Sequence, residues 1–388
     1  MNFFISFGRE QEEEVKISDK IIRFVKKEPI FIVATFLAVV SMFFVPVDKT
    51  YFSYIDTRVL ALLFSFMIVM AGLKELGIFY EMAGFLTKKV KDFRQLTFVL
   101  VFLCFFTSML ITNDVALITF VPFTILLLHM IGLEEKMISI IVLQTIAANL
   151  GSMLTPIGNP QNLYIYGLSG MNMGNFLSIM GPLTVLSAIL LVVGCMFQKK
   201  QNILTIKLEK SISLSKTEKI QFVYFVLVFL VSLLSVLRFI TYWIPLGISL
   251  FGTFFLRKEI LKKVDYNLLL TFLSFFIFIG NMGRMETVRN AMESLLEGRE
   301  VILAFLLSQV ISNVPTAILL SGFTSEWNLL LMGVNVGGLG TLIASLASLI
   351  SYKFYAQEEH SKKGKYILHF TIVNVIFAII LLFAATLL

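Results

Sequence analysis

The sequence predicts an all-α, polytopic membrane protein with two inverted repeats, each containing a re-entrant hairpin and a broken transmembrane helix. The first observation is composition: the 388 residues are 57% hydrophobic and 15% charged, with mean hydropathy +0.88, whereas soluble domains carry about 25% charged residues. The second is that polar, Asn-centred breaks interrupt two apolar stretches. Irregular backbone survives in lipid only where protein buries it or where it lines a solvated cavity. Paired breaks of this kind are typical of carriers built from internal repeats.

Membrane-crossing helices are predicted from apolar runs such as 30–45, 183–196 and 222–236. Their lengths approach the ~20 residues that a helix needs to span hydrocarbon, and a transmembrane β-barrel would show alternating segments instead. The first 28 residues mix acidic with basic side chains and show no short basic start with a cleavage site, so we expect no removable signal peptide. Cys104 and Cys195 lie in apolar runs and predict neither a disulfide nor a metal site.

The basic residues predict the orientation. With the N-terminus in the cytoplasm, we place crossings at 29–46, 58–73, 137–168, 177–197, 220–239, 243–256, 266–283, 328–350 and 366–388. Most of the 32 Lys and Arg residues then lie in the cytoplasmic segments 1–28, 74–94, 130–136, 198–219, 257–265 and 351–365. This asymmetry follows the positive-inside rule, so the net charge of +7 requires no nucleic-acid partner. We expect a multi-pass protein of a bacterial cell membrane.

Two further apolar stretches, each with an Asn motif near its middle, are predicted to be hairpins that return to their starting side. Aligning Ile55-Asp56 with Val264-Asp265 also matches later Leu, Ser and Phe positions, and the two halves run in opposite directions in this topology. The predicted organisation is a cytoplasmic segment 1–28; a first inverted repeat 29–197 with hairpin 95–130 and broken helix 137–168; a cytoplasmic linker 198–219; and a second inverted repeat 220–388 with hairpin 300–327 and broken helix 328–350.

The hairpin tips and the broken helices are predicted to carry the binding chemistry. Pro156 and Pro160 lack an amide hydrogen, and glycines let the backbone bend, so helix cannot continue through the breaks. Interrupted helices present free amides to an anion and free carbonyls to Na+. The candidate substrate- and ion-binding residues are Thr112, Asn113, Asp114, Asn149, Gly151, Ser152, Thr155, Gly158, Asn159, Asn162, Ser312, Asn313, Thr316, Asn335, Gly337, Gly338, Thr341 and Ser345.

Asp114 is the only acidic or basic residue between Arg94 and His129. A carboxylate within hydrocarbon costs on the order of 3 kcal/mol, so we expect a bound Na+ or a proton to compensate it. The predicted Na+ site comprises Asn113, Asp114 and Asn313. Two structural alternatives stay open: Asp114 could cap a helix, and the asparagines could join helices by hydrogen bonds.

Other classes of function have weaker support. His129, His360 and His369 are not spaced as metal ligands, so we predict no metal site beyond Na+. There is no GxxxxGK[ST] loop, which argues against ATP drive, and we predict no cofactor. No nucleophile, general base and orienting group converge, so we predict that the protein is not an enzyme. A membrane-embedded enzyme would reveal itself by a chemical product, and a channel by flux that neither saturates nor concentrates its solute.

Four motifs, in the same order, resemble the ion transporter superfamily. They are ITNDVALITFVP from Ile111, NLGSMLTPIGNPQN from Asn149, SNVPTAILL from Ser312 and GVNVGGLGTLIASLAS from Gly333. This superfamily includes arsenite efflux permeases, NhaD-type sodium/proton antiporters, citrate carriers and divalent anion/sodium symporters. The resemblance implies two inverted repeats that form a transport domain moving against a scaffold, often within a homodimer.

The hairpin tips depart from the symporter pattern, in which the asparagine lies between Ser and Thr. Asp114 follows Asn113 and Val314 follows Asn313, so the hydroxyl after each asparagine is missing, and Thr316 is the substitute in the second tip. This favours the arsenite, antiporter and citrate-carrier branches, where an Asn-Asp tip is familiar. We predict a secondary active transporter of a small anion (citrate, a dicarboxylate or an inorganic anion) coupled to Na+ or H+ by alternating access. A sodium/proton antiporter and an arsenite efflux permease are the alternatives.

Overall fold

The computed structural model describes residues 29–78, 90–203 and 214–388. The predicted N-terminal segment 1–28 and the middle of the predicted linker 198–219 lie outside the described residues. Within the described part the elements are helical. In chain order they are α2 (Pro29–Phe44), α3 (Tyr51–Tyr54), α4 (Thr57–Glu75), α6 (Phe93–Ser108), α7 (Asn113–Met130), η1 (Glu134–Lys136), α8 (Met137–Ser152), α9 (Pro160–Ser169), α10 (Met173–Met196), α11 (Lys216–Val236), α12 (Trp243–Gly247), η2 (Ile248–Gly252), α13 (Thr253–Arg257), η3 (Lys258–Lys263), α14 (Tyr266–Arg284), α15 (Glu286–Leu296), α16 (Glu300–Ile311), α17 (Asn313–Ser321), α18 (Trp327–Val336), α19 (Leu346–Ala356) and α20 (Lys363–Leu387).

Six helices of the described part are long and apolar enough to cross a membrane: α4, α7, α10, α11, α14 and α20. Shorter apolar helices are α2, α6, α16 and α18. Because a full crossing takes ~20 residues, short apolar helices are expected where the chain turns back or breaks inside the bilayer. The predicted all-α, polytopic membrane fold is confirmed.

Side-chain caps explain where several helices begin. Asp56, Asp92, Asn159 and Asp265 each accept a hydrogen bond from a backbone N–H three residues further on, at 2.9 to 3.0 Å. Such a cap contributes about 1 kcal/mol because it satisfies an amide that the helix leaves free. Asp56 and Asp265 are the pair aligned in the sequence, and the helices they start, α4 and α14, both have 19 residues.

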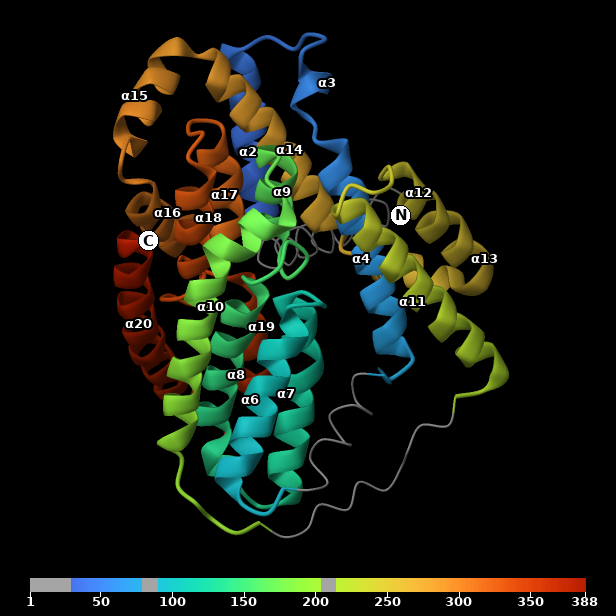
Figure 1. Ribbon diagram of the computed structural model, residues 1–388, viewed down its shortest axis with the longest axis vertical. Helices are drawn as coiled ribbons and strands as arrows, with labels where there is room; N and C mark the ends of the chain where they lie inside the picture. Colours follow the sequence, from blue (N-terminus) through green and yellow to red (C-terminus); the bar gives the residue numbers. More distant parts are fainter. Residues whose placement is uncertain (1–28, 79–89, 204–213) are drawn as a thin grey trace, which may run out of the picture.

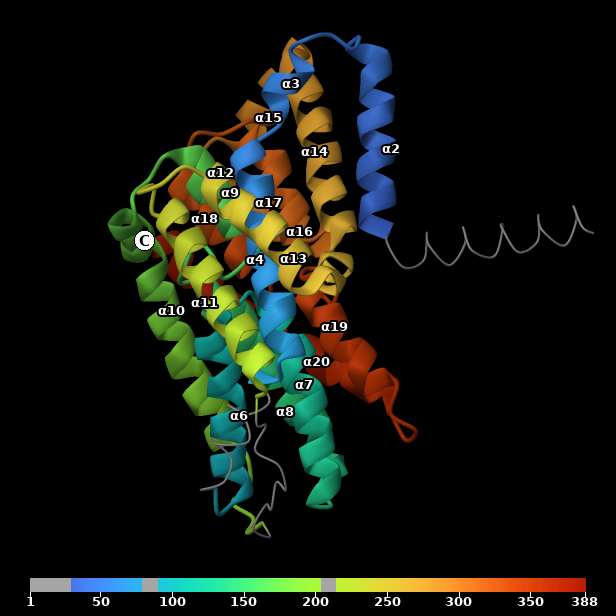
Figure 2. The same cartoon turned by 90° about the vertical axis from the view of Figure 1, so that its right-hand side faces the viewer.

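The helices form two groups (Figure 1). In one group α4 packs against α11, and α14 packs against α2, which stands at the edge of the molecule in Figure 2. In the other group α8 packs against α6, α7 and α10, and α18 packs against α16 and α17. The second group contains both Asn motifs and both interrupted helices.

Two helical hairpins approach the middle of the molecule from opposite ends (Figure 1). α6 and α7 rise from the lower end of the view, whereas α16 and α17 come from the upper end, beside α15. Each hairpin packs against the first half of an interrupted helix, α8–α9 for the first and α18–α19 for the second. The inverted repeats and their boundaries stay a prediction, with which this opposed arrangement is consistent.

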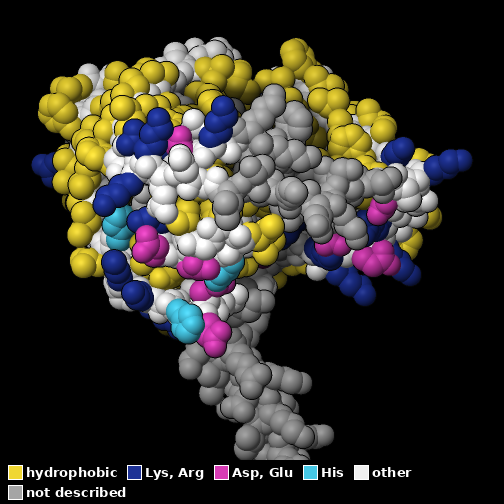
Figure 3. All heavy atoms as spheres, turned by 90° about the horizontal axis from the view of Figure 1, so that it is seen from below, with side chains coloured by type: hydrophobic (Ala, Val, Ile, Leu, Met, Phe, Trp, Pro, Cys, Tyr) yellow, Lys and Arg dark blue, Asp and Glu magenta, His cyan; other side chains and the backbone are white. Residues whose placement is uncertain are grey.

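The flanks of the molecule are apolar and its lower end is charged. Figure 3 shows Lys, Arg, Asp, Glu and His side chains on that end, with hydrophobic side chains around them. Phe43, Phe197 and Phe255 are each at least 80% exposed, an arrangement that is unfavourable in water and suits contact with lipid. A bilayer therefore surrounds the flanks; which end faces the cytoplasm stays a prediction.

Candidate functional site

The tip of the first hairpin is tied to the break between α8 and α9. The backbone N–H of Asn113 donates to the carbonyl of Gly158 at 3.1 Å, and its side-chain amide donates to Oδ1 of Asn149 at 3.0 Å. The side-chain oxygen of Asn113 accepts the backbone N–H of Asp114 at 3.0 Å. Asn113 therefore spends its hydrogen bonds on positioning, which leaves the Asp114 carboxyl group as the free polar group of this tip.

The second tip repeats the same backbone contact with different side chains. The N–H of Asn313 donates to the carbonyl of Ala344 at 2.9 Å. Ser312 has φ +74°, in the left-handed region that non-glycine residues rarely adopt, so this turn is strained. The Thr316 hydroxyl donates to the Ser312 carbonyl at 2.8 Å and is engaged within its own helix. Apolar Val314 follows the asparagine, so this tip carries no carboxylate.

The first break keeps its freed carbonyl groups inside the protein. The Asn162 amide lies 3.1 to 3.3 Å from the carbonyls of Ser152, Met153 and Thr155. The Thr155 hydroxyl donates to a backbone carbonyl of the hairpin, that of Met109. These contacts satisfy groups that would be costly to leave unpaired in an apolar interior.

Gln309 does the corresponding work at the second break. Its amide nitrogen donates to the carbonyls of Gly337 and Leu339 at 3.1 and 2.9 Å, and its oxygen accepts the N–H of Thr341 at 2.9 Å. Gly340 has φ +108°, and a Cβ there would lie 2.2 Å from Gln309 Oε1, so only glycine fits. The sequence analysis missed Gln309; its signal is a lone polar residue one turn before the tip.

Replacing Gln309 by Met is expected to lower the free energy of unfolding by about 2 kcal/mol, because two carbonyls and one amide lose their partner. Methionine is the residue at the aligned position of the first hairpin, where Thr155 contacts the Met109 carbonyl as Thr341 contacts that of Gln309. The measurement is the thermal midpoint of the purified protein in detergent. Exposed Gln357 replaced by Met is the control; equal midpoints for the two variants would contradict this role.

Asn149 joins the first broken helix to the second. Its side-chain oxygen accepts the hydroxyl of Ser345 at 3.1 Å, and its amide donates to the hydroxyl of Ser348 at 3.3 Å and to the carbonyl of Gly338 at 3.4 Å. Asn149, Ser345 and Ser348 are all buried. Ser348 was not among the predicted residues, because nothing in the sequence marks one serine of α19 over its neighbours.

Asn335 makes the reciprocal contacts from the second broken helix to the first. Its oxygen accepts the amide of Asn159 at 3.1 Å, and its own amide donates to Asn162 at 2.7 Å. Asn159 and Asn162 begin α9 in the same way that Ser345 and Ser348 begin α19. The two broken helices are therefore crossed and bonded by paired, buried contacts.

Glycines allow each hairpin to approach its broken helix closely. A Cβ on Gly151 would lie 2.0 Å from the Phe105 carbonyl oxygen, and one on Gly337 would lie 2.5 Å from Ser308 Oγ. A Cβ on Gly158 would lie 2.0 Å from the Ser152 carbonyl oxygen. These predicted site glycines serve packing, and so does Gly338, which lies against the Asn313 side-chain amide.

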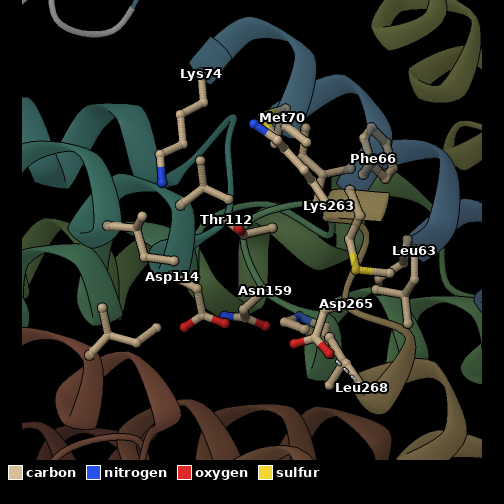
Figure 4. A pocket seen from close by; sticks show the side chains of 18 of the residues that line it. Leu63, Phe66, Met70, Lys74, Thr112, Asp114, Asn159, Lys263, Asp265 and Leu268 are labelled. Atoms are coloured by element: carbon tan, nitrogen blue, oxygen red, sulfur yellow. Dashed lines mark hydrogen bonds between the residues drawn. The ribbon is translucent and has the colours of Figure 1, made fainter. Parts of the chain in front are cut away.

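A cavity of about 380 Å³ lies between the first tip and helices α4 and α14 (Figure 4). Of the predicted residues, Thr112, Asp114 and Asn159 line it, and the others belong to the tips and breaks described above. Its remaining charged residues are Lys74, Glu75, Lys263 and Asp265. The apolar part of its wall comprises Leu63, Phe66, Met67, Met70, Ala71, Val115, Ile118, Ile157, Pro160, Leu163, Leu268 and Ile350.

The cavity's chemistry suits a small hard cation beside an anion. Carboxylate, hydroxyl and amide oxygens, as supplied by Asp114, Thr112 and Asn159, are the ligands that such cations prefer. Lys74 and Lys263 add positive charge near the α4 end. Within the described residues no cluster of three or more His, Cys, Asp or Glu side chains forms a site for a transition metal. The roles of these residues as ligands stay predictions.

The lipid-facing flanks, the paired breaks and the cavity beside them place the protein among the α-helical membrane transporters. More specifically, the chain belongs to the citrate transporter family, whose family model matches residues 17–326. The predicted resemblance to the ion transporter superfamily is thereby confirmed, and membership indicates a transporter rather than an enzyme.

Relatives from distant organisms are similar over most of the chain. Inner membrane protein YbiR of Escherichia coli K12 is 32% identical over 318 residues, covering 80% of this chain and 83% of that protein. The uncharacterized transporter MJ0456 of Methanocaldococcus jannaschii is 30% identical over 297 residues, covering 76% and 80%. The silicon efflux transporter LSI3 of rice is 34% identical over 155 residues, covering 39% of this chain and 31% of that protein.

Proposed function

We propose that the protein is a secondary active transporter that moves a small anion, coupled to Na+ or H+ by alternating access. The observation that carries the proposal is the cavity at the first hairpin tip, into which Asp114 presents the only carboxylate of the two tips. An acid in a membrane-spanning helix is unfavourable unless a cation or a proton accompanies it. The gradient of that ion would then supply the driving force for the anion.

The proposed substrate is citrate, a dicarboxylate or an inorganic anion. Membership of the citrate transporter family supports this class, as do Lys74 and Lys263 at the cavity. The silicon efflux relative is named for another small solute. A sodium/proton antiporter, in which Asp114 alone exchanges the two ions, and an arsenite efflux permease are the competing proposals. The working unit that we propose is a homodimer in the bilayer.

Alternating access requires one end of the molecule to be closed, and Arg238 supports such a closure. Arg238 follows α11 and donates to the carbonyls of Gly170 and Tyr166 at 2.8 and 3.1 Å, at the end of α9. Its guanidinium group also lies 5.4 Å from the centre of the Tyr166 ring. This clamp joins the two groups of helices at the end opposite Lys74 and Glu75, where the cavity meets charged side chains.

Replacing Arg238 by Ala is expected to open the clamped end more often, because the α9 carbonyls and the Tyr166 ring lose a cationic partner. A cysteine placed at cavity residue Leu163 should then react several-fold faster with a membrane-impermeant maleimide added from that side. The native thiols, Cys104 and Cys195, are buried and give a low background. An unchanged labelling rate, compared with Leu163→Cys alone, would count against a clamp.

The test of the proposed function is flux in proteoliposomes that contain the purified protein. Na+ and pH gradients are imposed separately while internal pH and the uptake of labelled citrate and succinate are recorded. We expect gradient-driven accumulation of an anion above its equilibrium concentration. Sodium-driven proton movement without any anion requirement would establish the antiporter instead, and flux that only dissipates gradients without saturation would indicate a channel.

A further inference from the structure

A second carboxylate faces the same cavity as Asp114, from the other group of helices. Asp265 is the first residue before α14, and Figure 4 shows its carboxyl group and that of Asp114 on either side of Asn159. Asp114 comes from the hairpin tip, so the two acids belong to elements that pack as separate groups. Asp265 was not among the residues that the sequence analysis selected.

Neither carboxylate is neutralised by a neighbour in the part of the chain that the structure describes. One oxygen of Asp265 accepts the N–H of Leu268 at 3.0 Å; its other oxygen and both oxygens of Asp114 have no hydrogen-bond or ion-pair partner there. Lys263, the nearest lysine in sequence, pairs with Glu75, which also lies 3.6 Å from Arg257.

Two unpaired acids in a largely apolar cavity repel one another. The wall around them includes Val115, Ile118 and Leu268, and charges interact more strongly next to such groups than in water. A cation or proton between the carboxylates removes the repulsion and supplies the missing partner of each. The buried Asn159 amide group and Thr112 line the same space and complete an oxygen-rich set.

We propose that Asp265 is the second carboxylate ligand of the coupling ion, so that the ion binds between the hairpin tip and α14. This inference rests on the proposed function and deepens it: ion binding would then depend on how the two groups of helices are placed. When the hairpin tip moves away from α14, the ion loses one of its two anionic ligands and is released more easily.

The structural alternative is that Asp265 only caps α14. The chain provides a matched control, since Asp56 caps α4 with the same hydrogen bond, to Val59 at 3.0 Å, and does not line the cavity. Asparagine is as good a cap as aspartate. Asp265→Asn and Asp56→Asn therefore both keep the cap and remove one charge, and only the first removes charge from the cavity.

The experiment measures, in proteoliposomes, the Na+ concentration and the pH that give half-maximal anion uptake. We expect Asp265→Asn to require about tenfold more Na+, or about tenfold more protons, because ligand charge sets cation affinity; Asp56→Asn should stay within about twofold of the parent. A second readout is the shift of the thermal midpoint in detergent on adding Na+, which should shrink in Asp265→Asn alone. Asp265→Ser, which also keeps a cap, repeats both measurements if the asparagine variant folds poorly.

The outcomes separate this inference from the function it builds on. Equal ion dependence in Asp265→Asn, Asp56→Asn and the parent would overturn it, while a loss of ion dependence in Asp114→Asn would leave the proposed function standing. If Asp114→Asn also kept its ion dependence, the proposed coupling itself would fail, and the inference with it.

Discussion

In proteoliposomes, the Asp114→Asn variant is expected to lose the dependence of anion uptake on the Na+ or pH gradient, with gradient-driven accumulation falling about 100-fold. The reason is that the amide has nearly the shape of the carboxyl group and cannot ionise, so it neither attracts a cation nor exchanges a proton. The ~3 kcal/mol that favours a compensated carboxylate over a bare one corresponds to roughly two orders of magnitude in occupancy.

The fold should tolerate this change. Asp114 lies in the first turn of α7, where losing a negative charge costs about 0.3 to 1 kcal/mol. The thermal midpoint in detergent without Na+ should therefore stay close to that of the parent. Asp56→Asn again serves as the control for the loss of one negative charge. Unchanged Na+ and pH dependence in Asp114→Asn would remove Asp114 from the coupling mechanism.

Gly151→Ala is expected to abolish transport and to lower the free energy of unfolding by about 3 kcal/mol or more. The added methyl group would lie 2.0 Å from a backbone oxygen, that of Phe105, and 2.6 Å from Ser108 Oγ. A backbone atom cannot rotate away as a side chain can, so α6 and α8 must separate. That movement would displace Asn149, two residues earlier, from its contacts with Asn113 and α19.

Gly181→Ala is the matched control, because Gly181 lies in membrane helix α10 and a Cβ there would meet nothing within 4 Å. Both variants are compared by yield of monodisperse protein, by thermal midpoint and by uptake. Gly181→Ala should behave as the parent. Equal thermal midpoints for the two alanine variants would show that α6 and α8 are less tightly packed than the structure indicates.

Local sequence signals were sufficient for the fold class and for the positions of the breaks. Polar residues inside apolar runs are costly in lipid, so Asn113 and Asn313 mark the two hairpin tips without any knowledge of the tertiary structure. Pro160 after Asn159 likewise marks a helix start, because proline suits the first turn and asparagine caps it. The alignment of Asp56 with Asp265 locates the starts of α4 and α14.

The arrangement of the site depends on contacts that no local pattern encodes. Sequence reasoning grouped all polar residues of the breaks as ligands, whereas the structure has Asn149 and Asn335 bonded across the two broken helices. Only the packing of α4 and α14 against the first hairpin reveals which polar groups face open space. Gln309 and Asp265 were missed for the same reason: their partners are distant in sequence.

The difference between the two tips, Asp114 in one and Val314 in the other, has a consequence for leakage. In the proposed cycle the loaded first tip is electrically compensated, but the empty tip carries a bare charge into hydrocarbon at a cost on the order of 3 kcal/mol. An unloaded carrier would thus reorient about 100 times less often than a loaded one. A single side chain would in this way prevent slippage, so that the ion gradient is not dissipated when no anion is available.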